Sequence, residues 1–140
     1  MIIIRNLEKE DAGQVALLIG QLTLNIIDPG TLVKRIEQLP KSSNSQFLVA
    51  KEHGNVVGVG GLAWYVIPSK GLIGWIEELV VDHEYRGRGI GRTIMEKLLR
   101  SAKQKNIKQL KLTSTPMAKG LYDKLGFVKK DQDYLVKNLW

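Results

Sequence analysis

A strand, a glycine-rich turn and a long helix follow one another directly in the second half of the chain. Residues 77–82 read Glu-Glu-Leu-Val-Val-Asp and residues 86–91 read Arg-Gly-Arg-Gly-Ile-Gly. Apolar residues with helical spacing then occur at Ile94, Met95, Leu98, Leu99 and Ala102. This spacing predicts a helix from about residue 90 to residue 105. Glycines let the backbone approach a ligand closely, and a helix N-terminus offers unpaired N–H groups, so the segment predicts an anion-binding site.

Three arginines, Arg86, Arg88 and Arg92, accompany the glycines of this turn. A guanidinium carries a fixed charge and a fork of N–H donors that matches phosphate oxygens, so the turn predicts a cradle for pyrophosphate. The P-loop pattern is absent, and neither frame of the dinucleotide pattern Gly-x-Gly-x-x-Gly places a glycine at its sixth position. ATP and NAD bound by these routes are therefore disfavoured. An Arg-Gly RNA-binding segment also fits poorly, because such segments are disordered and this one lies between a strand and a helix.

The composition is that of a folded protein with an uneven distribution of charge. The chain has 140 residues, 44% hydrophobic and 25% charged, which predicts a single globular domain over residues 1–140. The net charge is +7, and residues 86–140 carry 14 Lys and Arg against 4 Asp and Glu. This basic half favours an anionic ligand, either a phosphorylated cofactor, nucleic acid or an acidic membrane surface.

Several kinds of site are disfavoured by what the chain lacks. The absence of cysteine excludes disulfides, thiol nucleophiles and Cys-ligated metals. The two histidines, His53 and His83, are far apart and form no metal-binding pattern, so no metal site is expected, although a carboxylate site stays open. The N-terminal apolar stretch is too short for a signal peptide and no stretch is long enough to span a membrane, so a cytoplasmic location is expected.

The pattern along the whole chain predicts an α+β fold. The expected strands are 2–5, 46–51, 56–66, 72–81, 108–113, 127–128 and 134–136. The expected helices are a first helix that starts within residues 6–11 and extends to Leu22, followed by 32–39, 90–105 and 118–125. Thr31 is the expected cap of the second helix, after a break at Pro29-Gly30. The early strands form an antiparallel meander, and the strand–helix–strand order implies a right-handed parallel crossover between 77–81 and 110–112.

The turn and its surroundings resemble the GNAT family of N-acetyltransferases. Residues 86–91 match the family signature Arg/Gln-x-x-Gly-x-Gly/Ala. Residues 77–82 resemble the strand before that signature, and Leu112-Thr113-Ser114 the strand after it. The spacing Ala118-x-x-x-Tyr122-x-x-x-Gly126-Phe127 resembles the C-terminal block of the family. The resemblance implies one N-acetyltransferase domain: a mixed, mostly antiparallel sheet of six to seven strands, two of them parallel and splayed, with about four helices.

The resemblance also implies acetyl-CoA as the cofactor. Its pyrophosphate would lie on the signature turn, and its pantetheine arm would lie along the preceding strand, where a backbone N–H near Leu79 or Val80 polarises the thioester carbonyl. The implied cofactor-binding residues are Leu79, Val80, Val81, Arg86, Gly87, Arg88, Gly89, Ile90, Gly91, Arg92 and Thr115. Thr115 stands where the family often has an asparagine that contacts pantetheine. Its alternative role is a helix N-cap before Pro116.

Three side chains are the candidate catalytic groups. The two consecutive carboxylates Glu77 and Glu78 interrupt an apolar strand, and regular alternation would point them to opposite faces. We expect Glu77 to be the general base and Glu78 to contact the substrate; the reverse assignment, and ion pairs with neighbouring cations, stay open. Tyr122 stands at the tyrosine position of the family and is the expected acid for the leaving thiolate, unless it only packs in the core.

The acceptor is expected to be a primary amine, on a small molecule or on a protein lysine or N-terminus. The resemblance implies that the region 26–45 and the segment 64–70 flank its groove. Two other classes of function stay open: an acetyltransferase or basic module directed at tRNA or other nucleic acid, and a non-catalytic acyl-CoA sensor. Nucleic acid binding would weaken steeply with salt. Exposed strands at the C-terminus, ending at Trp140, also suggest a homodimer.

Overall fold

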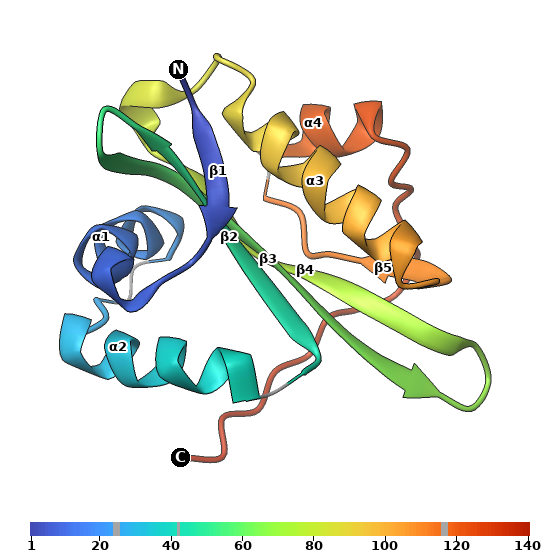
Figure 1. Cartoon of the computed structure of the whole chain (residues 1–140). Coiled ribbons are helices and arrows are strands. Elements are labelled where there is room, and N and C mark those ends of the chain that lie inside the picture. The colour runs from blue at the N-terminus through green and yellow to red at the C-terminus, as the bar shows by residue number, and fades with distance from the viewer. Residues whose placement is uncertain (24–25, 42, 116–117) are drawn as a thin grey trace.

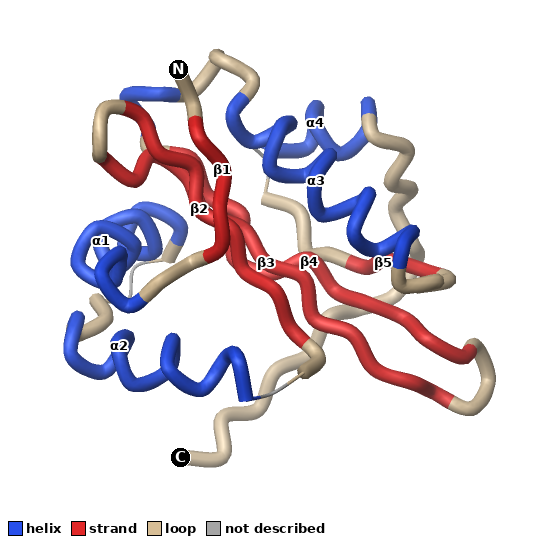
Figure 2. Tube along the Cα trace, in the orientation of Figure 1, coloured by secondary structure: helices blue, strands red, loops and turns tan. Residues whose placement is uncertain are grey.

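The computed structural model describes residues 1–23, 26–41, 43–115 and 118–140. Its centre is a single five-stranded sheet with the strand order β1-β2-β3-β4-β5 (Figure 2). The strands are β1 (Ile3–Asn6), β2 (Ser45–Glu52), β3 (Asn55–Ile67), β4 (Gly71–Val81) and β5 (Gln109–Lys111). The first four pair antiparallel to their neighbours, and β5 pairs parallel to β4. The predicted meander and the mixed sheet are therefore confirmed.

Helices cover both faces of this sheet (Figure 1). They are α1 (Ala12–Leu22), α2 (Pro29–Gln38), α3 (Ile90–Gln104) and α4 (Lys119–Lys124). One buried cluster joins α1 and α2 to the sheet, and a second joins α3 and Tyr122 of α4 to the opposite face. The predicted start of α2 was wrong. Pro29 occupies the first helical turn, where a missing N–H is harmless, and the Asp28 side chain caps the helix by accepting from the Thr31 N–H at 3.0 Å. No helix in the described part of the chain is long and apolar enough to cross a membrane.

The parallel pairing of β4 with β5 is short. It joins Ile73, Gly74 and Trp75 to Gln109, Leu110 and Lys111. The expected crossover partner of residues 110–112 was residues 77–81, so the strand pairing was predicted correctly but its register was not. Beyond Trp75, β4 continues to Val81 while the chain after Lys111 leaves the strand conformation. The two parallel strands are therefore splayed, with an open edge of β4 between them.

The two final strands that were expected at 127–128 and 134–136 do not form. Residues 127–140 carry no strand, and the sheet of the described chain has five strands, not six or seven. A strand requires a paired neighbour, so the apolar, β-branched composition of these segments is not sufficient by itself. In Figure 1 this red C-terminal segment leaves α4, passes β5 and continues beyond the sheet.

Candidate functional site

A β-bulge lies at the centre of β4 and carries the two candidate carboxylates. Val80 pairs with Val59 and Glu77 pairs with Gly61, so β4 has one more residue than β3 between these two pairs. Glu78 adopts the left-handed conformation that releases this extra residue, with φ of 52°. The bulge interrupts the alternation on which the opposite-face prediction rested. Ile76 and Leu79, three residues apart, consequently pack in the same cluster, and Glu77 and Glu78 between them are both exposed.

The surroundings make both carboxyl groups more basic than usual. Partial burial raises the pKa of Glu77 above its ordinary value. Partial burial also raises the pKa of Glu78, although its side chain is still exposed at the surface; the charge of Glu77 adds to this shift, and the charge of Arg35 on α2 opposes it. A desolvated carboxylate beside another carboxylate holds a proton more tightly, which is the property a general base needs. No ion pair joins either group to a cation in the described part of the chain.

The glycine–arginine turn connects the end of β4 to α3. Gly87 and Gly89 have φ of 82° and 77°, a conformation that side chains disfavour, and Gly89 is the N-cap of α3. The helix therefore begins at Ile90, and the N–H groups of its first turn have no partner within the helix. A Cβ at Gly91 would lie 3.4 Å from Val81 Cγ2 and 3.7 Å from Leu121 Cδ2. This helix start consequently adjoins both the end of β4 and α4.

The three arginines of the turn have different surroundings. The Arg86 Nε–H donates to the backbone oxygen of Val81 at 3.2 Å. Arg92 on α3 lies 3.5 Å from Glu96, one helical turn further along. Arg88 extends to the end of β2, where its guanidinium lies 3.3 Å from the Glu52 carboxylate and 4.9 Å from the ring centre of Tyr85. The three charges thus do not converge on one point.

The remaining β4 residues expected to bind the cofactor lie along the open edge of that strand. Val80 is buried on the α1–α2 side of the sheet, and Leu79 and Val81 pack on the α3 side. β5 pairs with β4 only as far as Trp75, so no strand of the described chain pairs with this edge at Leu79 and Val80. Val80 itself pairs with Val59 of β3, whereas Leu79 has no partner among the described residues of either neighbouring strand, so the backbone of Leu79 is the part of this edge that is open to a ligand between the splayed strands.

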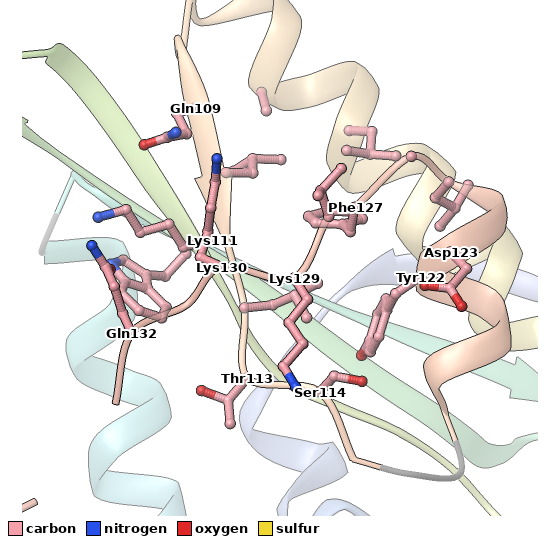
Figure 3. A pocket seen from close by; sticks show the side chains of 18 of the residues that line it. Gln109, Lys111, Thr113, Ser114, Tyr122, Asp123, Phe127, Lys129, Lys130 and Gln132 are labelled. Carbon is pink, nitrogen blue, oxygen red and sulfur yellow. The ribbon is translucent and has the colours of Figure 1, made fainter. Parts of the chain in front are cut away.

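Tyr122 lies on the α3 side of this opening. Its side chain is buried, with 6% exposed, and its ring makes an edge contact with Phe127 at 5.9 Å. Burial raises the pKa of its hydroxyl, which keeps the phenol protonated at neutral pH. Figure 3 shows the hydroxyl directed into a cavity that Thr113 and Ser114 also line. The ring of Tyr122 is therefore packed in the core while its hydroxyl reaches a cavity, and its role as the acid for the leaving thiolate stays a prediction.

This cavity, of about 1310 Å³, lies beside β5 and does not include the glycine–arginine turn. Its walls are β5, the segment after it, the end of α3, α4 and residues 125–134 (Figure 3). Thr115 is one of the residues that line this cavity, and it is exposed. The alternative role of Thr115, a helix N-cap before Pro116, falls on residues 116–117, which lie outside the described residues, and it stays a prediction.

Sequence reasoning missed two residues near the site. Glu52 binds Arg88 from 36 positions away, and Arg35 approaches Glu78 from α2. Neither belongs to a motif, because an exposed charged residue in a hairpin or on a helix surface has no local signature. For Glu52 the only signal was the acidic excess of residues 1–85, which have 10 Asp and Glu against 7 Lys and Arg, and this excess identifies no single residue.

Comparison with known proteins identifies the family. The family model described as "Acetyltransferase (GNAT) domain" matches residues 8–140. The chain is 36% identical over 61 residues to glucosamine 6-phosphate N-acetyltransferase 1 of Oryza sativa subsp. japonica; the match covers 44% of this chain and 37% of that enzyme. It thus spans little more than a third of that relative's length.

Solved structures resemble the whole chain. The crystal structure of glucosamine-6-phosphate N-acetyltransferase from Arabidopsis thaliana has a TM-score of 0.86 and 25% identity, covering 99% of each chain. A predicted acetyltransferase of Clostridium acetobutylicum, solved with acetyl-CoA, has a TM-score of 0.79 and 22% identity over 99% of this chain and 97% of that one, and so shows the shared fold. The splayed parallel strands, the glycine–arginine turn at the start of α3 and the matching family model together show that the chain belongs to the GNAT family of acetyltransferases.

Proposed function

We propose that the protein is an acetyl-CoA-dependent N-acetyltransferase that acetylates a primary amine. The observation that carries the proposal is the opening between β4 and β5, which has unpaired helix N–H groups at one end and two exposed carboxylates on the bulge of β4. Acetyl-CoA, when bound, supplies the acetyl thioester. The residues present fit such a group, because the start of α3 offers N–H donors and a positive dipole end to phosphate and the edge of β4 offers backbone groups to an amide-containing arm.

Each catalytic residue has a role that its surroundings support. Glu77 removes a proton from the acceptor ammonium, directly or through water, and its raised pKa favours this transfer. Glu78 contacts the acceptor amine. The backbone N–H of Leu79 or Val80 polarises the thioester carbonyl. Tyr122, whose hydroxyl reaches the cavity beside β5, donates its proton to the leaving sulfur.

We further propose an anionic amino sugar as the acceptor, with glucosamine 6-phosphate as the first compound to test. The Glu77–Glu78 pair suits the ammonium group of such a molecule. Arg35 on α2 supplies a positive charge close enough to lower the pKa of Glu78, and it has no ion-pair partner among the described residues. A molecule that carries both an amine and a phosphate would satisfy both charges.

Calorimetric binding of acetyl-CoA, followed by a thiol-release assay, tests this function. The expected results are binding of acetyl-CoA but not of ATP at equal concentration, and turnover with at least one amine. Glu77→Gln should lower kcat by about 10² to 10⁴ with unchanged acetyl-CoA affinity. Binding without turnover by any amine would instead indicate an acyl-CoA sensor. Absence of binding, together with salt-sensitive RNA binding, would refute the proposal in favour of a nucleic-acid module.

The acceptor is tested by comparing glucosamine 6-phosphate with glucosamine. If Arg35 binds the phosphate, Arg35→Met should raise KM for the phosphorylated sugar and leave KM for glucosamine unchanged. Lys34→Met is a matched control, because Lys34 is also an exposed cation on α2. Equal loss with both sugars would refute the phosphate contact.

We also propose that the chain forms a homodimer through its C-terminal segment. Large apolar side chains are exposed there at Val128, Tyr134, Leu135, Val136, Leu139 and Trp140. β5 pairs with only one neighbour, so its other edge is open within the described chain. An unpaired apolar segment and an unpaired sheet edge in the same molecule allow two copies to complete each other.

Light scattering of the full chain tests the dimer. Leu135→Glu combined with Leu139→Glu should convert a dimer to a monomer without unfolding it, because both side chains are exposed in the single chain. Val66→Glu, at an equally apolar and exposed position on β3, should have no effect. A monomeric wild type, or a dimer that persists in the double variant, would refute this assembly.

A further inference from the structure

The glycine–arginine turn is tied to the fold in two different ways. Its first part, Asp82 and His83, is held by hydrogen bonds from its own backbone N–H groups. The Asp82 N–H donates to Val57 O at 2.9 Å, and the His83 N–H donates to the Gln21 side chain at 3.0 Å. The second part contains the two left-handed glycines and is exposed. There, Arg88 forms a contact with a distant strand, the ion pair with Glu52 at the end of β2.

The side chain of Arg88 extends towards β2 and not towards β5. The sheet order places β3 between β2 and β4, and β5 on the opposite side of β4. With neighbouring strands about 4.8 Å apart, the end of β2 is roughly 10 Å from β4, on the side away from the β4–β5 opening. The guanidinium of Arg88 therefore points away from the edge along which the cofactor arm would lie.

The side chain of Arg88 is 56% exposed and has two partners. Glu52 is half-buried, with 17% of its side chain exposed, and it lies 3.3 Å from Arg88. The Tyr85 ring lies under the guanidinium at 4.9 Å, a distance at which the ring face attracts a cation. Two partners from different elements, β2 and the short 3-10 turn His83–Tyr85, thus hold the same guanidinium.

We propose that Arg88 is a positioning residue that clamps the turn onto β2, and that Gly87–Gly91 bind the cofactor phosphates through backbone N–H groups that this clamp holds in place. The inference rests on the proposed function, because acetyl-CoA affinity is one of its readouts. The sequence motif alone cannot distinguish two roles for Arg88. Its guanidinium could contact phosphate directly, or it could hold in place the backbone N–H groups that contact phosphate.

The two roles predict opposite results for Glu52→Gln. If Arg88 clamps the turn, Glu52→Gln and Arg88→Gln should each weaken acetyl-CoA binding by roughly three- to tenfold, and the double variant should lose no more than either single one. If Arg88 were a phosphate ligand, Glu52→Gln would release it from a competing carboxylate and strengthen binding. Glu52 also lies 4.0 Å from the Met1 amine, and the double-mutant cycle removes this contribution because both Glu52 variants lack it.

Further readouts separate the clamp from a general loss of stability. The clamp predicts a raised KM for acetyl-CoA, an unchanged kcat at saturation, and partial rescue by Arg88→Lys, which keeps the charge but not the planar fork. Glu96→Gln is the matched control, because it removes the carboxylate next to Arg92 without touching β2. That variant should leave both KM and the turn unchanged.

Hydrogen exchange of residues 86–91 without ligand tests the clamp independently of the proposed function. Faster exchange in Glu52→Gln and Arg88→Gln, but not in Glu96→Gln, is the expected result. Unchanged exchange together with tighter binding by Glu52→Gln would overturn the clamp. If the wild type binds no acetyl-CoA but the variants still show the expected differences in exchange, the proposed function is refuted and the clamp is retained.

Discussion

Of the substitutions considered, one that breaks the ion pair between Arg5 and the buried Asp11 should lower the free energy of unfolding the most. Asp11 is 3% exposed, and both of its oxygens accept hydrogen bonds of 2.8 Å from the Arg5 guanidinium. The Glu8 N–H adds a bond of 2.9 Å, and Lys51 lies 3.9 Å away. Burial alone would raise the pKa of Asp11, but these partners outweigh it and hold the pKa below its usual value.

Arg5→Met leaves the Asp11 carboxylate buried with one backbone donor and a distant lysine. Breaking a buried pair in this way costs about 3–5 kcal/mol of unfolding free energy, which for a chain of this size lowers Tm by roughly 10–20 °C. Asp11→Asn should cost less, about 1–3 kcal/mol, because the partly exposed Arg5 can regain water and asparagine still accepts from the Glu8 N–H. Lys119→Met is the control: its pair with Asp123 is exposed, and its loss should cost under about 1 kcal/mol.

Urea unfolding at pH 7 and between pH 5 and 3 provides the assay. In the wild type the folded pKa of Asp11 is depressed, so its stabilisation is present above the unfolded pKa and is lost as the pH falls through the folded pKa. In Arg5→Met the pKa should instead be raised, because burial is no longer balanced. Acidification should then reduce the difference between the variant and the wild type. A variant within about 1 kcal/mol of wild type at pH 7, or an equal difference at both pH values, would refute this reasoning.

Three other substitutions test separate parts of the structure. Gly61→Ala should lower the unfolding free energy by about 1–3 kcal/mol in urea titration, because its Cβ would lie 2.2 Å from the Phe47 ring; an unchanged midpoint would contradict this. Gly89→Ala should raise KM for acetyl-CoA without lowering kcat, since φ of 77° disfavours a side chain, whereas Gly120→Ala in α4 should not. Glu78→Gln should raise Tm at pH 7, because partial burial and the neighbouring Glu77 carboxylate raise the pKa of Glu78 and so destabilise its charged form. This gain in Tm should vanish as the pH falls through the raised pKa. A gain in Tm that persists at low pH would contradict the prediction.

Local patterns were sufficient for the elements that are defined by their own residues. The amphipathic spacing of α3, the hairpin between β2 and β3 and the glycine–arginine turn were all predicted near their observed bounds. The family also followed from short motifs at the correct spacing. These features depend on neighbours within a few positions, where backbone preference and the hydrophobic period act directly.

Features that depend on a partner strand were not predictable in the same way. The bulge at Glu78 exists because β4 carries one residue more than β3 between two fixed pairs, which is a property of the pairing and not of either strand. The final strands failed to form for a related reason, since apolar composition does not supply a partner.

The sequence by itself thus determined the α+β class, the glycine–arginine turn and the residue types of the candidate site. Only the tertiary structure decided how those residues are presented. It placed Glu77 and Glu78 on one bulge, ended the β4–β5 pairing at Trp75, and brought Glu52 to Arg88 across 36 positions. The physical reason is the distance along the chain over which the interactions act. Propensity and periodicity act over a few residues, whereas register, splay and a clamp between distant strands are fixed only when the sheet and both helical layers pack together.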